Sequence, residues 1–466
     1  MWKFVFVVVF ASLTAAGCAF DAKGGGGGGG STGRGGFGLI GGFGGSPTQG
    51  PCTGLQCQQS TCKMGNCTQP ACPGGVVTTL SGKVYDPAGK VPLYNVDVYV
   101  PNAALTPYTD GPSCDTCATN LSGAPLVKTK TDAAGNFKLG DSIADVPAGA
   151  NIPLVIQVGK WRREVTIANV PACADMPLTD TNMTRLPRNQ SEGHLPKIAL
   201  TTGGADALEC LLRKIGISDS EFTTPAGAGR VNFYAGIDGT DQFNAALGGE
   251  AFMSVAPWWD DVNNLRKYDM ILHSCDGTEN PNNKSQAARD ALKAYADGGG
   301  RVFASHWHNY WFERGPAPWP MIANFSHQAD LAIPFTATID TSFQRGEALA
   351  DWLVNVGGST TRGELVIRGA QHTINTVGTG RRWIYSANPQ SVQYLDANTP
   401  IGSQSACGRV VLSDIHVSTG GGAADEDDSD ADLSFPDGCK TTDLSPQEKT
   451  LEFMIFDLSS CIDIIG

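Results

Sequence analysis

The sequence predicts a multi-domain protein in which an all-β sandwich precedes an α/β domain with a doubly wound parallel sheet. Two patterns support this prediction. Short segments that alternate apolar and polar residues, separated by turn residues, fill residues 76–190 and are typical of a sandwich. Apolar strands that alternate with amphipathic helices fill residues 191–466 and predict a parallel sheet covered by helices. Residues 1–17 and 18–75 precede both domains as a signal peptide and a tether.

The composition favours a protein that is exported from the cytosol. Charged residues make up only 17% of the 466 residues, and 14 residues are cysteine, which is unusual in a reducing compartment. The 33 Lys and Arg residues are outnumbered by 46 Asp and Glu residues, so the formal net charge is -13. An acidic chain does not neutralise phosphates, and we therefore expect no nucleic-acid partner.

Residues 1–17 are typical of a secretory signal peptide, because Lys3 precedes an apolar run, Phe4–Phe10, that is too short to span a membrane. The sequence Ala-Ala-Gly-Cys at residues 15–18 resembles a bacterial lipobox. The resemblance implies that Cys18 is lipidated and becomes the mature N-terminus, and that Ala19 after it directs the lipid anchor to the outer membrane. Ordinary signal-peptidase cleavage is the alternative and would give an extracellular protein.

The tether, residues 18–75, consists of a Gly-rich part and a cysteine repeat. Gly24–Gly30 is an uninterrupted glycine run, which buries too little surface to fold. Five cysteines then recur every five residues at Cys52, Cys57, Cys62, Cys67 and Cys72. Zinc sites prefer Cys-x2-Cys pairs and no His lies nearby, so this repeat favours a stalk linked by disulfides.

The sandwich segment contains a turn, Asp86–Gly89, before a strand over Val96–Val100 that alternates with period two. Two motifs, Gly82-x-Val84-x-Asp86 and Thr131-Asp132-x-x-Gly135-x-Phe137, resemble the carboxypeptidase regulatory-like, or transthyretin-like, family. The resemblance implies a non-catalytic module that folds, spaces or binds and has carbohydrate-binding relatives. Cys114 and Cys117 lie in an inserted loop, where we expect a structural disulfide because a redox motif needs a strand–helix setting.

The α/β segment has strands over Tyr268–His273, Arg301–Ser305 and Gly408–Ser413, each followed directly by polar residues. The strand that ends at Ser305 should be central, because its Val-Phe-Ala core is apolar on both faces. A helix over Ser285–Asp297 is closed by glycines, and the last helix begins at Pro446 after an N-cap serine. This alternation predicts a flavodoxin-like sheet.

Three motifs in this segment resemble the class I glutamine-amidotransferase-like family, in its trehalose-utilisation-type branch. They are Tyr268-Asp269-Met270-Ile271-Leu272, Tyr295-x-x-Gly298-Gly299-Gly300-Arg301-Val302-Phe303-x-x-His306, and Gly408-Arg409-Val410-x5-His416. The resemblance implies that His416 corresponds to the triad histidine. The family's nucleophilic cysteine would fall near Ser305. Phe303 and Trp307 flank that position, where a nucleophile elbow needs small residues, so the sequence lacks the pattern that amidotransferase catalysis requires.

Ligands of open parallel sheets gather beyond the carboxyl ends of the strands, where His306, His308 and His416 should converge. With Asp276 or Glu279 these histidines could hold zinc or another divalent metal, which is the candidate cofactor. The alternative is that the histidines hydrogen-bond to the backbone and hold loops.

Cys275 also follows a strand at this edge and is a candidate catalytic residue with His306 and His416. A nearby histidine could lower the pKa of its thiol and make it a nucleophile. The alternatives are a Cys210–Cys275 disulfide and an inert buried thiol.

Aromatic residues near the same edge predict a ligand-binding surface for a sugar, because aromatic faces stack on sugar rings. The candidate ligand-binding residues are Trp307, His308, Tyr310, Trp311, Asp276 and Asp414. A loop core beneath the cleft is the alternative. After His416 comes an acidic insertion, Asp425–Asp432, for which we expect a solvated loop closed by a Cys407–Cys439 disulfide.

Two functions fit these observations. The first is a non-catalytic surface lipoprotein that binds carbohydrate, peptidoglycan or a protein partner, and the broken elbow favours it. The second is an extracytoplasmic hydrolase that uses the histidine cluster at the carboxyl edge of the sheet, with or without a divalent metal.

Overall fold

The computed structural model describes residues 52, 54–62, 67–114, 117, 121–369, 372–417, 429–441 and 443–462. The predicted signal peptide, Cys18 and the Gly-rich part of the tether lie outside these residues, as do the first four residues of the predicted acidic insertion. Within the described ranges, no helix combines the length and the apolar character that crossing a membrane requires.

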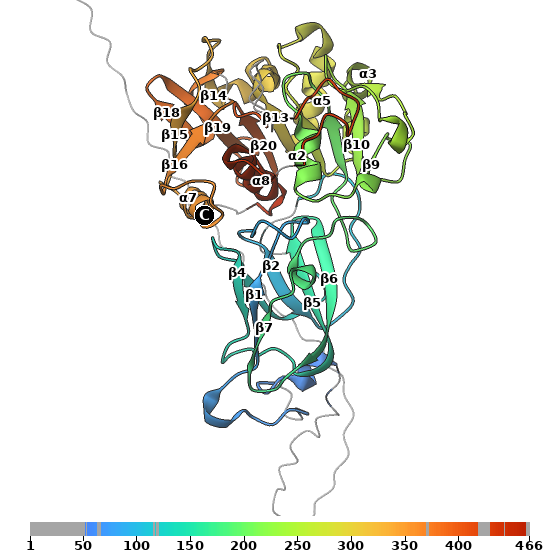
Figure 1. The fold of residues 1–466 in the computed structure, drawn as a ribbon, viewed down its shortest axis with the longest axis vertical. Coiled ribbons are helices and arrows are strands. Elements are labelled where there is room, and N and C mark those ends of the chain that lie inside the picture. The colour runs from blue at the N-terminus through green and yellow to red at the C-terminus, as the bar shows by residue number, and fades with distance from the viewer. Residues whose placement is uncertain are drawn as a thin grey trace, which may run out of the picture. The chain divides into compact units, whose positions relative to one another are not determined.

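The first part of the chain forms two β-sheets that pack face to face (Figure 1). The three-stranded sheet has the order β4 (Asn136–Leu139), β1 (Thr79–Lys83), β7 (Asp175–Leu178). The four-stranded sheet has the order β3 (Pro125–Lys130), β2 (Asp97–Pro101), β5 (Gly149–Val158), β6 (Trp161–Val170). Inward-facing side chains such as Leu80, Val98 and Ile156 are fully buried and form the core. The sandwich-like sheets predicted from the period-two pattern are therefore present.

The Thr131–Phe137 motif forms the turn between β3 and β4. Asp132 Oδ1 accepts hydrogen bonds from the backbone N–H groups of Ala134 and Asn136, both at 2.8 Å. Gly135 has a φ of 75°, and a Cβ there would meet Pro92 at 2.6 Å, so no larger residue fits. The motif thus has a local structural role, because it reverses the chain and sets the register of β4 against β1.

The second part contains a large mixed sheet with the order β11-β10-β8-β12-β13-β20-β19-β18-β15-β16 and with β9 paired to β10. From β11 to β20 the neighbouring strands are parallel. These strands are β8 (Ile198–Thr201), β9 (Phe222–Thr223), β10 (Val231–Ala235), β11 (Met253–Ser254), β12 (Met270–His273), β13 (Arg301–Ser305) and β20 (Gly408–Ser413). The strand that ends at Ser305 lies between β12 and β20, in the middle of the sheet, as predicted.

From β20 onward the neighbouring strands of the sheet are antiparallel, which the sequence did not predict. This half comprises β19 (Gln390–Thr399), β18 (Arg381–Ala387), β15 (Phe335–Ile339) and β16 (Glu364–Ile367). A separate two-stranded sheet pairs β14 (Ala323–Phe325) with β17 (Ile374–Val377). The chain is therefore β-rich, with several sheets.

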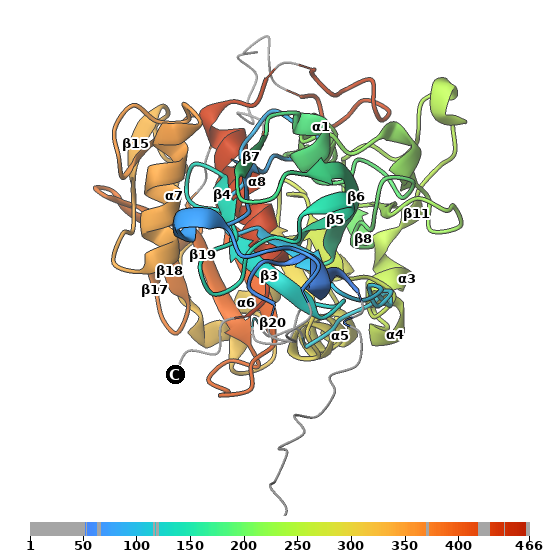
Figure 2. The same cartoon turned by 90° about the horizontal axis from the view of Figure 1, so that it is seen from below.

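Helices contribute to two apolar clusters of the mixed sheet. One cluster includes α2 (Leu208–Lys214), α7 (Gln344–Asn355) and α8 (Pro446–Ser459). The other includes α3 (Val255–Trp259), α4 (Val262–Leu265), α5 (Gln286–Asp297) and α6 (Tyr310–Glu313). The short α1 (Thr181–Thr184) follows the sandwich. Figure 2 shows α3, α4 and α5 together and apart from α7.

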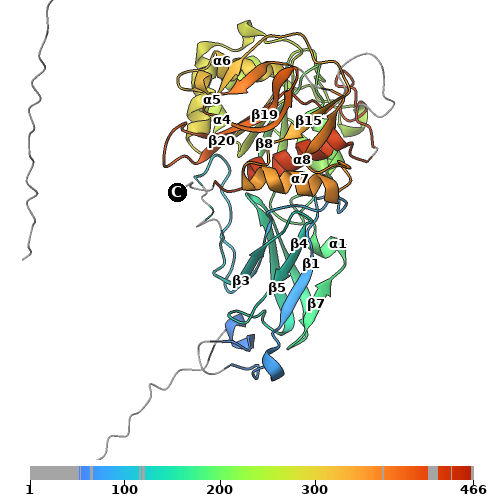
Figure 3. The same ribbon diagram turned by 90° about the vertical axis from the view of Figure 1, so that its left-hand side faces the viewer.

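Helix α8 begins as predicted, because Ser445 and Glu448 form a reciprocal capping box and Pro446 occupies the first turn. Helices α7 and α8 lie side by side next to the sandwich (Figure 3). Trp352 of α7 donates to the carbonyl of Pro92 at 2.6 Å, and Phe453 of α8 stacks on Tyr94 at 5.9 Å.

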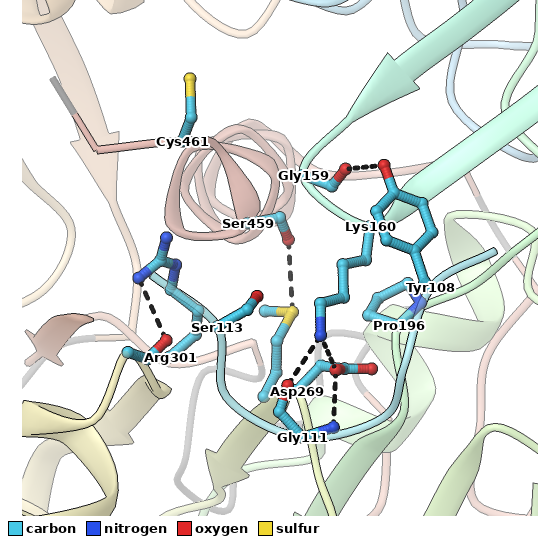
Figure 4. Close-up of a pocket in the computed structure, with 12 residues that line it drawn as sticks. Tyr108, Gly111, Ser113, Gly159, Lys160, Pro196, Asp269, Arg301, Ser459 and Cys461 are labelled. Carbon is cyan, nitrogen blue, oxygen red and sulfur yellow. Dashed lines mark hydrogen bonds and ion pairs between the residues drawn. The ribbon is translucent and has the colours of Figure 1, made fainter. Parts of the chain in front are cut away.

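A buried ion pair also joins the sandwich to the mixed sheet. Lys160, in the β5–β6 turn, donates from Nζ to Asp269 Oδ1 at 2.6 Å and to the carbonyl of Gly111 at 2.7 Å (Figure 4). It also donates to the carbonyl of Thr109 at 2.9 Å. Both side chains are buried. The cavity beside them has a volume of about 30 Å³, which is room for a water molecule rather than a ligand, so these groups have a structural role.

Six disulfides link cysteines of the described residues: Cys52–Cys57, Cys62–Cys67, Cys72–Cys173, Cys114–Cys407, Cys117–Cys461 and Cys210–Cys439. The cysteine repeat is therefore disulfide-bonded, as predicted, and its last member is tied to the sandwich. This density of disulfides is typical of a protein that folds outside the reducing cytosol.

The predicted Cys407–Cys439 disulfide is wrong. Residues 429–441 run along residues 240–244, where the N–H of Thr240 donates to the carbonyl of Ala431 at 2.7 Å. This path carries Cys439 to Cys210 on α2, away from the start of β20. The alternative Cys210–Cys275 pairing is wrong for the same reason.

The prediction that Cys114 and Cys117 form structural disulfides is confirmed. The inserted loop lies against the mixed sheet, and its two cysteines pair with Cys407 before β20 and Cys461 after α8. The loop therefore fastens the sandwich to the second part of the chain through two long-range links.

Candidate functional site

The carboxyl ends of β12, β13 and β20 bring together three predicted site residues. These strands are parallel neighbours, so the residues that follow them meet at one edge of the sheet. Cys275 lies two residues after β12, His306 directly after β13, and His416 three residues after β20. We refer to Cys275, His306 and His416 as the Cys275 centre.

His306 occupies a sharp strand-to-helix turn. Its φ is 38°, a left-handed conformation that is unusual for a residue with a Cβ. Such a conformation costs about 1–3 kcal/mol and persists where the surrounding structure holds it, often at functional sites. Ser305, near which the amidotransferase resemblance would place a nucleophile, directly precedes this turn.

The three side chains of the Cys275 centre are close enough to share one ion. Cys275 Sγ lies 3.3 Å from His306 Nδ1, and the rings of His306 and His416 are 5.2 Å apart between centroids. One sulfur or nitrogen atom from each residue lies within 4.8 Å of the other two. The three residues are at most 2% exposed.

Burial governs the protonation of the centre. Burial lowers the pKa of His306, and the neighbouring His416 and His308 lower it further. Burial also lowers the pKa of His416, although the nearby Asp206 carboxylate acts to raise it. Burial raises the pKa of the Cys275 thiol to about 12, although the backbone N–H groups of Trp307 and Gly277 oppose the shift. The thiol is therefore protonated at neutral pH, which disfavours its role as a free nucleophile.

His416 has no hydrogen-bond partner for either ring nitrogen among the described residues. A buried imidazole normally has a partner, because leaving a polar group unpaired costs about 1–3 kcal/mol. The two nitrogens are therefore available to a bound ion or a water molecule.

The donor set fits zinc. Typical Zn–S and Zn–N bond lengths in a tetrahedron place a sulfur and a nitrogen ligand about 3.6 Å apart, close to the separation between Cys275 and His306. Three protein ligands with one open position are the pattern of zinc sites that bind a water molecule or a substrate.

His308 was predicted as a metal ligand, and the structure contradicts this. Its Nε2 is 2.8 Å from the carbonyl of Ser274, and its Nδ1 accepts from Trp311 Nε1 at 2.9 Å. Both ring nitrogens are occupied because the 3-10 turn after His306 points the His308 ring back toward the loop that follows β12. Cys275 takes the position expected for this histidine.

Asp206 is a functional candidate that was not predicted from the sequence. Its Oδ2 accepts from Ser305 Oγ at 2.5 Å, and its Oδ1 accepts from the backbone N–H of Val417 at 2.8 Å. One buried carboxylate thus fixes the residue before His306 and the residue after His416. Its position directly before an amphipathic helix did not distinguish it from other loop aspartates.

Asp276 was predicted to face a ligand, but it is buried in an ion pair. Its Oδ2 accepts from Lys284 Nζ at 2.9 Å, and Lys284 also donates to the carbonyl of Glu279 at 2.8 Å. Lys284 is fully buried. This pair holds the loop after β12 rather than binding a ligand.

Asp414 and Trp311 were also predicted to contact a ligand, and both are fully buried. Asp414 accepts from the N–H and Oγ1 of Thr373 at 2.8 and 2.6 Å, and burial raises the pKa of its carboxyl to about 7. Trp311 packs against Trp259 and His273 in the core. These residues are structural because the loops of the edge fold over them.

Trp307 and Tyr310 are only half-buried and remain candidates for ligand contact. The Trp307 ring packs on His306 at 4.5 Å and on His327 at 5.8 Å. Beside them His327 Nε2 lies 2.8 Å from Glu313 Oε2 and 3.5 Å from Glu279 Oε1. Glu279, which the sequence placed among the possible metal ligands, therefore faces this outer group and not the Cys275 centre.

The comparisons with known proteins add little to this geometry. No family model and no curated protein match the chain. Among solved structures, similarity was found to an N-terminal interface mutant of a type II cohesin–X-dockerin complex from Acetivibrio cellulolyticus, at 19% identity over 32% of this chain and 78% of that chain. The TM-score is 0.14, so this similarity supports no statement about fold or function.

Proposed function

We propose that this chain is an exported, envelope-tethered protein that binds a zinc-type divalent metal ion with Cys275, His306 and His416. The observation that carries the proposal is the convergence of three buried donor atoms within 4.8 Å around a histidine whose ring nitrogens are unpaired. A bound divalent ion would take one of the two ring nitrogens of His416 and stabilise the thiolate form of Cys275.

The fold assignment that accompanies this proposal is a flavodoxin-like, class I glutamine-amidotransferase-like domain. The parallel order β10-β8-β12-β13-β20 and the strained turn at His306 support it. The sandwich would then be a carboxypeptidase regulatory-like module, which is supported by its two sheets and by the Asp132 turn. In this assignment the metal centre replaces the amidotransferase nucleophile.

The proposed location is the outer membrane, through lipidated Cys18 and the Gly-rich tether. The lipobox-like residues 15–18 and the dense disulfides support export. A mutant carrying Cys18→Ser would leave the membrane fraction if the anchor is the lipid, and an unchanged membrane fraction would contradict lipidation.

A hydrolase is the second candidate function, because a three-ligand site with an open fourth position can activate water. The burial of all three ligands favours binding of an ion over turnover of a polymer. Carbohydrate or peptidoglycan binding would depend on the half-buried Trp307 and Tyr310, since the other predicted aromatic residue, Trp311, is in the core.

Metal analysis of protein folded under oxidising conditions tests the proposal. The protein is incubated with zinc or cobalt, desalted and measured for bound metal, and the cobalt form is examined for thiolate charge-transfer absorption. Wild type should retain one ion per chain, and Cys275→Ser and His416→Gln should lose it. His194→Gln serves as the matched control, because His194 lies beside the sandwich, where its Nδ1 is 2.7 Å from the carbonyl of Lys160. Equal retention by all variants would contradict the proposal.

A further inference from the structure

A large cavity beside the sandwich is lined by more basic than acidic residues, although the whole chain is acidic. Its volume is about 1080 Å³, and it is bounded by the turn after β1, the ends of α2 and α7, and the segment before α8. Acidic residues outnumber basic ones in the whole chain, yet six basic residues and three acidic residues line this cavity. The basic residues are Lys90, Arg188, Arg213, Lys214, Lys440 and Lys449, and the acidic residues are Asp86, Asp219 and Asp443. We call this space the junction cavity.

Half of these cations have a carboxylate partner. Lys90 pairs with Asp443 and Arg213 with Asp219, each at 2.7 Å, and Lys214 pairs with Glu448 at 2.7 Å. Arg213 and Lys214 also lie in the last turn of α2, where the helix dipole favours positive charge. Helix geometry and local ion pairs therefore account for these three cations.

The other three cations, Arg188, Lys440 and Lys449, form no salt bridge within the part of the chain that the structure describes. Arg188 donates from Nε to the carbonyl of Pro87 at 2.9 Å, and Lys449 donates from Nζ to the carbonyl of Val356 at 2.9 Å. These carbonyl partners hold the Arg188 and Lys449 groups in place and carry no net charge of their own. The two cations are thus positioned without a direct carboxylate partner among the described residues.

The acidic residues of the cavity offset little of this charge. Asp219 and Asp443 are already paired, and Asp86 is 1% exposed, with Oδ1 accepting from the N–H groups of Lys90 and Val91 at 2.7 and 3.1 Å. A fixed excess of positive charge in a concave site attracts anions, and the volume exceeds what a small ligand needs.

We propose that the junction cavity binds a ligand that carries several phosphate or carboxylate groups on a polar body, as an anionic glycan does. Lys and Arg recognise both groups, and Arg188 can present its remaining N–H donors to them. The cavity shares no residue with the Cys275 centre, so the proposal is independent of metal binding.

Calorimetric titration of the full exported chain at low ionic strength tests this proposal, with inorganic tripolyphosphate and an oligogalacturonate as probes. Saturable binding of tripolyphosphate alone would identify phosphate as the recognised group, binding of oligogalacturonate alone would identify carboxylate, and binding of neither would overturn the proposal. Added salt should weaken the binding.

Charge-removing variants locate the site. Lys440→Met combined with Lys449→Met should weaken binding at least tenfold, whereas Asp443→Asn should strengthen it because it frees Lys90. Lys293→Met is the matched control, since Lys293 lies on α5 and pairs with Asp297 outside the cavity. Equal affinity in the double variant and the control would overturn the proposal, provided that thermal unfolding shows both to be folded.

Discussion

The carboxyl of Asp86 should make the stability of this protein depend on pH. Asp86 lies in the turn after β1 and is 1% exposed, next to the fully buried Glu452 of α8. Asp86 Oδ2 and both Glu452 oxygens have no hydrogen-bond partner among the described residues. Burial raises the pKa of Asp86 from its ordinary value of 3.8 to about 6, and burial together with Asp86 raises the pKa of Glu452.

The sign of the effect follows from proton linkage. The folded state holds the Asp86 proton more tightly than the unfolded state does. The stabilisation that this proton gives the folded state is therefore complete below about pH 4. It is lost as pH rises through about 6. The pKa difference corresponds to about 3 kcal/mol, and no solvent screening reduces it because the side chain is buried. Lys90 and Lys449, which lower these pKa values, are already included in the shifts.

The assay is denaturant unfolding with intact disulfides from pH 4 to pH 7. Asp86→Asn retains an acceptor oxygen for the N–H groups of Lys90 and Val91, and it should reduce the fall in the free energy of unfolding over this range by about 3 kcal/mol. Asp290→Asn, at an exposed carboxyl on α5, is the control and should leave the fall unchanged. An equal fall in wild type and Asp86→Asn would refute the reasoning.

Three further predictions concern stability and the site. Lys160→Met removes the nearer cation of the buried Asp269 and leaves Arg230, 3.6 Å away, as the other. The free energy of unfolding in urea should fall by about 3 kcal/mol, and a loss below about 1 kcal/mol would contradict a role for the Lys160–Asp269 pair. Asp206→Asn should weaken zinc binding about 10- to 100-fold in a chelator competition, because Asp206 positions the neighbours of two ligands; unchanged affinity would limit Asp206 to bracing loops. Replacing Cys210 and Cys439 together by serine should cost about 2–5 kcal/mol in the same unfolding assay, and no measurable loss would show that this disulfide adds nothing to stability.

The sequence predicted those features that depend on local pattern. Period-two segments and the Asp132 turn indicated the sandwich sheets, and the apolar run at Val302–Ala304 indicated the central position of β13. Because parallel strands end at one edge, the meeting of His306 with His416 also followed from strand order alone.

The features that the sequence did not predict depend on long-range packing. The pairing of Cys439 with Cys210 follows from the path of residues 429–441, which no local pattern encodes. Trp311 and Asp414 come after strands, which is also where exposed site residues are found. The loops of the sheet edge nevertheless cover both side chains. His308 is a histidine that follows a strand, as a metal ligand at this edge would be. Only its bonds to Ser274 and Trp311 exclude it as a metal ligand.

X-ray absorption at the zinc edge of the loaded protein tests the central claim most directly, because it reports the atoms bound to the metal. The Cys275 centre predicts one sulfur at about 2.3 Å and two imidazole nitrogens at about 2.0–2.1 Å, with one further light ligand. A shell of oxygen and nitrogen without sulfur would contradict the account, since it would place the ion elsewhere, for example on Glu279, Glu313 and His327.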